Sequence, residues 1–188
     1  MRRTKEEALQ TRGALLRAAA DIVVGQGAGS FTLEAVAQHA GVTKGGLLHH
    51  FPSKEALVDG LIDDVLERFA SRLQVELANE AEGQPGHWMR AYIRMMLAVQ
   101  DDDFYLIPTL AAIVVSQPAT IERIRSAMLT SQQAAAHDGI DPTRATIIRL
   151  AVDGLLFTRA FHLDVVDDDI RRDVLDALIG MTRASGED

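Results

Sequence analysis

Five residues between positions 44 and 50 have the chemistry and spacing expected of a nucleic-acid contact: Lys44, Gly45, Gly46, His49 and His50. Two glycines inside a short helix cost about 1 kcal/mol each, so a helix that serves only for packing has no use for them. They suit a helix whose backbone comes close to a phosphate or a base edge. We expect Lys44 to donate to O6 and N7 of a guanine, and His49 to donate to a base edge.

The surrounding residues predict two short helices and a turn that would position these side chains. Thr32 is a suitable N-cap for the first helix, and Thr43 for the second. Gly41 can adopt the positive φ that a tight turn between the two requires. Ser53 is expected to cap a third helix, and Lys54 stands at the start of that helix. The pattern is typical of a helix-turn-helix that binds DNA, and Thr32, Thr43 and Lys54 are predicted to contact phosphates.

Residues 8–62 resemble the DNA-binding domain of the TetR/AcrR family of bacterial repressors. The matching features are the FT pair before the first short helix, the turn sequence AxxAGVTKG at 37–45 and the exit sequence HFxxKExL at 50–57. The resemblance implies a three-helix domain, and it implies that His50 touches a phosphate. One departure is that Leu48 and His49 stand where the family commonly has aromatic residues. An operator sequence therefore cannot be taken over from a relative.

Charge is unevenly distributed along the 188-residue chain, whose net charge is −8. Residues 1–54 contain seven Lys or Arg and four acidic residues, a net charge of +3, which leaves −11 for the remainder. A basic head attracts DNA while an acidic body is repelled by it. This distribution suits a regulator that should not coat the chromosome.

Other functions find little support in the sequence. The chain has no cysteine, no Gly-x-Ser-x-Gly elbow and no phosphate-binding loop, so we expect no catalytic site and no enzyme. His87, His137 and His162 lack metal-ligand spacing, and the acidic runs at 101–103 and 167–169 are better explained as helix caps, so no metal or other cofactor is expected. Without an apolar leader or a run of 18 apolar residues, the sequence indicates a cytoplasmic protein with no membrane contact.

Helical periodicity predicts an all-α fold: an N-terminal three-helix helix-turn-helix DNA-binding domain and a C-terminal helical domain for ligand binding and dimerisation. The first domain is expected at 1–54 and the second at 55–188, linked through a long helix. A capping box, in which Glu7 reaches back to Thr4, would open the first helix. The predicted helices are 4–25, 32–40, 44–50, 53–81, 86–100, 103–116, 118–136, 143–164 and 168–184, with breaks that include 101–103 and 138–142.

The last two helices are predicted to form a homodimer. The helix over 143–164 has apolar residues on more than one face, so more than one face must be buried. In a chain of this length one face can meet the body and another must meet something else, for which a second subunit is the economical answer. The helix over 168–184 adds an apolar stripe, and two helices from each chain would make a four-helix interface around a two-fold axis. The alternative is that both helices belong only to the core.

A small-molecule pocket is expected in the second domain, where aromatic residues and methionines gather. Such side chains form an adaptable apolar pocket with a few polar handles. The resemblance places the pocket between these helices and the helix over 143–164. Ordinary core packing is the alternative for each residue taken alone. The predicted pocket residues are Trp88, Met89, Tyr92, Met96, Phe104, Tyr105, Leu110, Phe157, Phe161 and His162.

The sequence thus predicts a ligand-responsive, DNA-binding transcriptional regulator. By resemblance it is a repressor that binds a pseudo-palindromic, double-stranded operator as a dimer and is released by a small apolar or amphipathic inducer. An enzyme is the main alternative class. A helical partner-binding module without a DNA role is another, and it would require the basic head and the paired glycines to be accidental.

Overall fold

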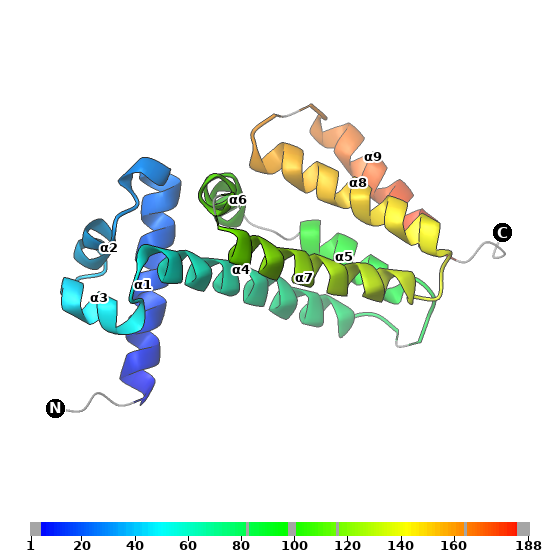
Figure 1. Cartoon of the computed structure of the whole chain (residues 1–188). Coiled ribbons are helices and arrows are strands. Elements are labelled where there is room, and N and C mark those ends of the chain that lie inside the picture. Colours follow the sequence, from blue (N-terminus) through cyan, green and yellow to red (C-terminus); the bar gives the residue numbers. More distant parts are fainter. Residues whose placement is uncertain (1–4, 82, 98–100, 116, 164, 184–188) are drawn as a thin grey trace. The chain divides into compact units, whose positions relative to one another are not determined.

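Helices make up all of the regular structure in the described part of the chain (Figure 1). The structure is a computed structural model that describes residues 5–81, 83–97, 101–115, 117–163 and 165–183, without the side chains at 97, 101–105 and 109. The all-α prediction is confirmed for these residues. The helices are α1 (Lys5–Gln26), the 3₁₀ turn η1 (Ala28–Ser30), α2 (Leu33–His39), α3 (Lys44–His50), α4 (Lys54–Leu77), α5 (His87–Leu97), α6 (Asp101–Val114), α7 (Pro118–Ala136), α8 (Pro142–Ala160) and α9 (Asp168–Met181).

The chain divides into two compact units. The first contains residues 1–66 and 105–122, and the second contains 67–104 and 123–188. The expected division after residue 54 lies inside the first unit, whose share of α4 extends to Leu66. The hydroxyl of Thr120 donates to Oδ1 of Asp59 over 2.7 Å, which ties the start of α7 to α4 within this unit.

The first unit has an apolar core around which the helix-turn-helix is built. The buried side chains of α1 recur at intervals of three and four residues, as its amphipathic sequence predicts. Side chains from α2, α3 and α4 complete the core, and α2 packs against both α1 and α3 (Figure 1). The fully buried residues include Leu15, Ile22, Phe31, Val36, Leu47, Leu57 and Leu61.

At Gly60, α4 packs closely against this core. A Cβ atom added to Gly60 would lie 2.6 Å from Cε1 of Phe51 and 3.2 Å from Cδ2 of Leu16. The ring of Phe51 also has the guanidinium of Arg12 over it, 5.2 Å from the centroid. A cation in this position is attracted by the ring quadrupole. The residue that ends α3 is therefore held between α1 and α4.

In the second unit α5, α8 and α9 pack against one another (Figure 1). Each contributes apolar side chains from one face, and the faces repeat with helical periodicity. α8 is buried on this side at positions three and four residues apart, as a core helix must be. The buried residues of these three helices include Met89, Ile93, Ile148, Val152, Leu175 and Leu178.

A buried carboxylate between α7 and α8 caps α5. Asp138 is 4% exposed, and its two oxygens accept hydrogen bonds from the backbone N–H groups of Trp88 (2.9 Å) and Met89 (2.8 Å). The N–H groups of a first helical turn have no acceptor within their own helix. The predicted break at 138–142 does connect two helices, α7 and α8. The sequence pattern did not indicate that Asp138 in this break also caps α5.

Two helix boundaries in the middle of the chain differ from the predicted ones. α6 begins at Asp101, so the acidic run at 101–103 starts a helix instead of separating two. Carboxylates are favoured there, because a first turn carries the positive end of the helix dipole. α4 ends at Leu77, short of residue 81, and Glu80 just beyond it accepts from Nε of Arg90 in α5 over 2.8 Å. Thr4, and with it the predicted capping box, lies outside the described residues.

The last two helices are shorter than predicted. α8 ends at Ala160, because His162 adopts a left-handed φ of 52° and the N–H of Leu163 turns back to the carbonyl of Thr158 over 2.9 Å. α9 ends at Met181. The ends predicted at 164 and 184 were taken from the spacing of apolar residues. That spacing does not indicate where a helix stops, such as the turn that ends α8.

Gly60→Ala is expected to destabilise the first unit by about 1–3 kcal/mol, because the new methyl group overpacks the contact with Phe51 and Leu16. Urea unfolding followed by circular dichroism measures the loss. Gly25→Ala is the control, since a Cβ at that position of α1 meets nothing within 4 Å. Equal unfolding free energies for Gly60→Ala and the wild type would contradict the close packing.

Candidate nucleic-acid interface and small-molecule site

Hydroxyl caps begin α2, α3 and α4, as the sequence predicts. Oγ1 of Thr32 accepts from the N–H of Ala35 over 3.2 Å, and Oγ1 of Thr43 accepts from the N–H of Gly46 over 3.1 Å. Ser53 caps α4 in the same way. Thr32 and Thr43 are exposed, so each hydroxyl proton can still be donated to a phosphate oxygen.

Gly41 forms the turn between α2 and α3. Its φ of 69° lies in the left-handed region, which glycine adopts without steric cost. The N–H of Gly41 bonds to the carbonyl of Gln38 over 3.2 Å, and that of Val42 bonds to the carbonyl of Ala37 over 2.9 Å. The turn predicted from the position of this glycine is confirmed.

The short helix α3 has one buried face and one exposed face. Leu47 is fully buried, and Phe51, which ends the helix, is 3% exposed. Lys44, Gly45 and His49 lie on the exposed side. The two residues predicted to contact bases are therefore presented to solvent while the helix stays anchored.

Two of the predicted phosphate contacts, His50 and Lys54, are less exposed than these residues. His50 is half-buried, and its ring meets that of His49 edge-on at a centroid distance of 5.5 Å. The side chain of Lys54 is also half-buried, with Nζ over the ring of Phe31 at 5.2 Å from the centroid. Packing against Phe31 limits the positions that the Lys54 ammonium can reach.

The two glycines of α3 have different surroundings. A Cβ at Gly45 would meet nothing within 4 Å, so the backbone there faces open space. A Cβ at Gly46 would lie 3.3 Å from Oγ1 of Thr43, the hydroxyl that caps the helix. Packing against the Thr43 hydroxyl thus favours glycine at position 46, whereas no contact within the fold restricts position 45 to glycine.

Lys44 is paired with a residue that the sequence analysis did not single out. Its Nζ contacts Oε1 of Glu34 in the first turn of α2. Both side chains are at the surface, with 62% of Glu34 and 56% of Lys44 exposed. The hydrogen bond from Lys44 is the largest of the effects that hold the pKa of Glu34 below its ordinary value, so the carboxylate is charged at neutral pH.

Three residues of α5 that were predicted to line a pocket are packed into the second unit. Trp88 and Tyr92 stack with ring centroids 5.2 Å apart, and Met89 is fully buried. The Tyr92 hydroxyl donates to the carboxylate of Asp153, which also accepts from Nη1 of Arg149 over 2.8 Å. Burial, together with the charge of Asp153, raises the pKa of Tyr92, so the phenol remains neutral.

The other predicted pocket residues have several different surroundings. Leu110 is a buried residue of the first unit. Phe157 and Phe161 contact each other at a centroid distance of 4.4 Å and are 53% and 38% exposed. His162 follows them and is exposed. The side chains of Phe104 and Tyr105 lie outside the described part of the chain.

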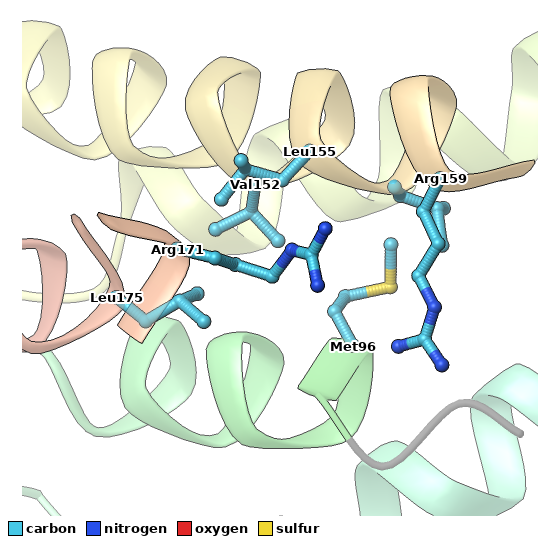
Figure 2. Close-up of a pocket in the computed structure, with 7 residues that line it drawn as sticks. Met96, Val152, Leu155, Arg159, Arg171 and Leu175 are labelled. Carbon is cyan, nitrogen blue, oxygen red and sulfur yellow. The ribbon is translucent and has the colours of Figure 1, made fainter. Parts of the chain in front are cut away.

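A recess in the second unit lies between α5, α8 and α9, and Met96 is the predicted pocket residue that lines it (Figure 2). Its cavity volume is about 40 Å³, whereas a protein cavity that admits benzene has roughly 150 Å³. The guanidinium groups of Arg159 and Arg171 appear on either side of the Met96 side chain (Figure 2). The lining residues are Met96, Val152, Leu155, Leu156, Arg159, Arg171 and Leu175.

Several residues of these two sites were not predicted from the sequence. An acid at the position of Glu34 is already explained by the helix dipole, so its pairing with Lys44 gave no separate signal. Arg159 and Arg171 stand on helices that the analysis treated as apolar stripes. The sequence feature that could have drawn attention to Arg171 is Asp168, which stands three residues earlier and forms an ion pair with it.

Two sequence profiles of known families match the chain. One, described as "Bacterial regulatory proteins, tetR family", matches residues 15–61, which include α2, α3 and the turn between them. The other, described as "Tetracyclin repressor-like, C-terminal domain", matches residues 86–183, more than half of the chain. The chain belongs to the TetR family. Membership confirms the resemblance drawn from residues 8–62 and extends it beyond the helix-turn-helix.

Individual TetR-family proteins are similar to the chain at different levels. The HTH-type transcriptional regulator TtgR of Pseudomonas putida is 42% identical over 67 residues, 36% of this chain and 32% of that protein. The HTH-type transcriptional repressor BepR of Brucella suis is 42% identical over 62 residues, 33% of this chain and 30% of that protein. The aligned part of the chain thus spans about a third of the length of these curated relatives.

A solved structure shares the fold of the chain over almost its whole length. The crystal structure of a transcriptional regulator from Rhodococcus sp. Rha1 superposes with a TM-score of 0.75 at 22% identity, covering 91% of this chain and 95% of that chain. The matched families and the named relatives are those of transcriptional regulators.

The described residues contain no feature typical of a membrane span or a metal site. No helix among them is long and apolar enough to cross a membrane. In the same part of the chain, no three His, Asp or Glu side chains are grouped so that they could hold a metal ion.

Proposed function

We propose that this TetR-family chain is a transcriptional repressor that binds a pseudo-palindromic operator as a homodimer and is released by a small apolar or amphipathic inducer. The observation that carries the proposal is the exposed face of α3, which presents Lys44, Gly45 and His49 while Leu47 is fully buried. A helix anchored in this way can enter a major groove without losing its packing. The name of the relative BepR, a repressor, supports the sign of regulation.

The proposed DNA contacts divide into base contacts and phosphate contacts. Lys44 would donate to O6 and N7 of a guanine, and His49 would donate to a neighbouring base edge. Gly45 would let the backbone of α3 approach the groove, because no side chain stands there. The phosphate contacts are assigned to Thr32, Thr43, His50 and Lys54.

Exposed apolar stripes on α8 and α9 support a homodimer through these two helices. Large apolar residues that face water are unfavourable unless a partner covers them. A Cβ at Gly154 would meet nothing within 4 Å, which leaves room for a second helix to approach closely. The α8 stripe, at intervals of three and four residues, is Ile147, Leu150, Gly154, Phe157 and Phe161, and the exposed α9 residues include Ile170 and Met181.

The recess between α5, α8 and α9 supports an inducer site in the second unit. Its apolar walls suit an apolar group, and the guanidinium groups of Arg159 and Arg171 suit an acidic one. Because its volume is only about 40 Å³, a ligand would require these helices to move apart. A ligand that favours the opened arrangement would shift the population toward it. α4 contributes residues to both units, so we place the coupling to the DNA-binding unit there.

Lys44→Ala and His49→Ala are expected to weaken operator binding about 5- to 150-fold, because each base contact contributes about 1–3 kcal/mol. Mobility shifts on DNA that flanks the gene, with excess competitor DNA at fixed near-physiological salt, measure the affinity. Arg172→Ala is the matched control, since it removes an exposed cation of the second unit.

Normal operator binding by both α3 variants would refute the assignment of the recognition residues. A wild-type protein that gives no discrete, competitor-resistant shift would refute the repressor proposal as a whole. The helical partner-binding module would then be the better explanation of the chain.

Leu150→Arg is expected to convert the dimer into monomers, because it places a charge on the α8 stripe where the partner helix would pack. Sedimentation velocity at micromolar concentration measures the oligomeric state. Met128→Arg on α7 is the control, since Met128 is 52% exposed and Leu150 is 57% exposed. If Met128→Arg dissociates the dimer and Leu150→Arg does not, the interface lies on α7 and the proposed α8–α9 interface is wrong.

Hexanoate is expected to raise the melting temperature and to weaken the DNA complex, whereas 1-hexanol at the same concentration does so less. Arg159→Met should weaken hexanoate binding about tenfold or more, because a charge-assisted hydrogen bond contributes about 1.5–3 kcal/mol. Arg172→Met, outside the recess, should leave it unchanged. Equal responses to the acid and the alcohol would count against an anionic inducer.

A further inference from the structure

Glu34 places a carboxylate beside the residue that is proposed to read the bases. Its Oε1 contacts Nζ of Lys44, and Thr32, a proposed phosphate contact, is only two positions earlier in the chain. Both partners of the pair are more than half exposed, so the pair belongs to the surface of the helix-turn-helix and not to its core. A duplex bound against α3 would therefore meet a negative charge together with the positive one.

Folding stability does not account for this pair. An exposed ion pair between two flexible side chains contributes little, because water and salt screen it. The helix dipole favours an acid in the first turn of α2, but it does not require that the acid bond to Lys44. Glu55 has the equivalent place in the first turn of α4, and its pKa is lowered mainly by hydrogen bonds from its own backbone and from Ser53, with a smaller effect from the charge of Lys54. The fold therefore does not require the contact with Lys44, which leaves room for a reason that involves DNA.

The donors of Lys44 provide such a reason. A lysine ammonium has three N–H donors and no acceptor. One of them is directed to Glu34, and the two that are left match O6 and N7 of a single guanine. The pair can therefore persist in a complex with the right base, where Glu34 holds the ammonium in position. A phosphate oxygen that took the same ammonium would lie beside the Glu34 carboxylate and would be repelled by it.

We propose that Glu34 is a specificity-determining residue that lowers the affinity for DNA of arbitrary sequence more than the affinity for the operator. The inference rests on the proposed function and adds to it a positioning residue that acts through Lys44. In a non-specific complex Lys44 has two options. It can keep its contact with Glu34 and make no phosphate contact, or it can bind a phosphate oxygen and bring that oxygen close to the Glu34 carboxylate. In the operator complex neither loss occurs.

The size of the effect follows from the separation of the charges. Two like charges about 8 Å apart in water change an association constant by about two- to threefold. A dimer carries two Glu34 residues, so their removal should change the affinity for non-specific DNA by about fivefold. The free Lys44 would also become an additional phosphate contact in each head, which steepens the dependence of affinity on salt.

Glu34→Gln tests the proposal in the full-length dimer. Affinity is measured over a series of salt concentrations for two duplexes of equal length, the footprinted fragment from the gene's flanking DNA and a random sequence. The variant should bind the random duplex about fivefold more tightly, and the slope of log K against log salt should steepen by about one unit per head. Affinity for the footprinted fragment should rise less or fall, so the ratio of the two affinities decreases.

Two further variants separate this role from a general effect of charge. Glu55→Gln removes the same charge from the same unit and should change both affinities by the same factor. In a Lys44→Met background, Glu34→Gln should no longer steepen the salt dependence, because Glu34 acts through Lys44. Urea unfolding confirms that each variant is folded at the assay temperature.

The outcomes distinguish failure of this inference from failure of the proposed function. If Glu34→Gln keeps the wild-type affinity ratio and salt slope, or if Glu55→Gln lowers the ratio equally, Glu34 is not a specificity determinant. If the wild-type protein itself does not distinguish the two duplexes, the proposed function fails and the role of Glu34 fails with it.

Discussion

The burial of Leu47 is the constraint on which the DNA-binding unit depends. A helix of seven residues is not stable alone in water, because its nucleation is costly and few hydrogen bonds follow. α3 forms because Leu47 fills the core, the hydroxyl of Thr43 caps its first turn, and Phe51 is held against Gly60 and Arg12 at its end. The opposite face can then carry glycine and charged residues without unfolding the helix.

A similar division applies to the second unit, where α8 separates a core face from an exposed one. Ile148 and Val152 are buried, whereas Leu150 and Phe157 are exposed. A helix that was apolar on only one side would leave no surface for a partner. The polar network of α5 and α8, in which Asp153 accepts from both Tyr92 and Arg149, satisfies the buried polar groups between them. The packing of the unit is therefore complete on its inner side before any partner binds.

Local chemistry was sufficient to predict the helix-turn-helix. The contacts of three residues, Thr32, Gly41 and Thr43, are made with groups no more than four positions away. Their roles can therefore be predicted from short stretches of sequence. The same is true of the all-α class, which follows from periodicity. The DNA roles of Lys44 and His49 stay predictions, since they depend on a partner that the chain alone does not contain.

Residue type did not predict most of the residues that line the recess, because it does not determine which faces of the helices meet. Trp88 and Tyr92 were assigned to a pocket for their chemistry, and in the structure they stack on each other beside the partly buried Arg149–Asp153 ion pair. Arg159 and Arg171 line the recess because α8 and α9 bring them together, twelve positions apart in the chain. The start of α6 was predicted two residues too late for a different reason. Three acidic residues in a row indicate both a solvated loop and a helix N-terminus, and the pattern alone does not choose between them.

The position of Asp138 has a consequence for the order in which the second unit is assembled. Its carboxylate completes the first turn of α5, but it stands 50 residues after Trp88 in the chain. During synthesis at about 5–20 residues per second, the amides of Trp88 and Met89 wait roughly 3–10 s for their acceptor to be made. Until then α5 has an unsatisfied first turn and an uncovered apolar face. The second unit therefore cannot be completed helix by helix as the chain emerges, and its folding must wait until the connection between α7 and α8 has left the ribosome.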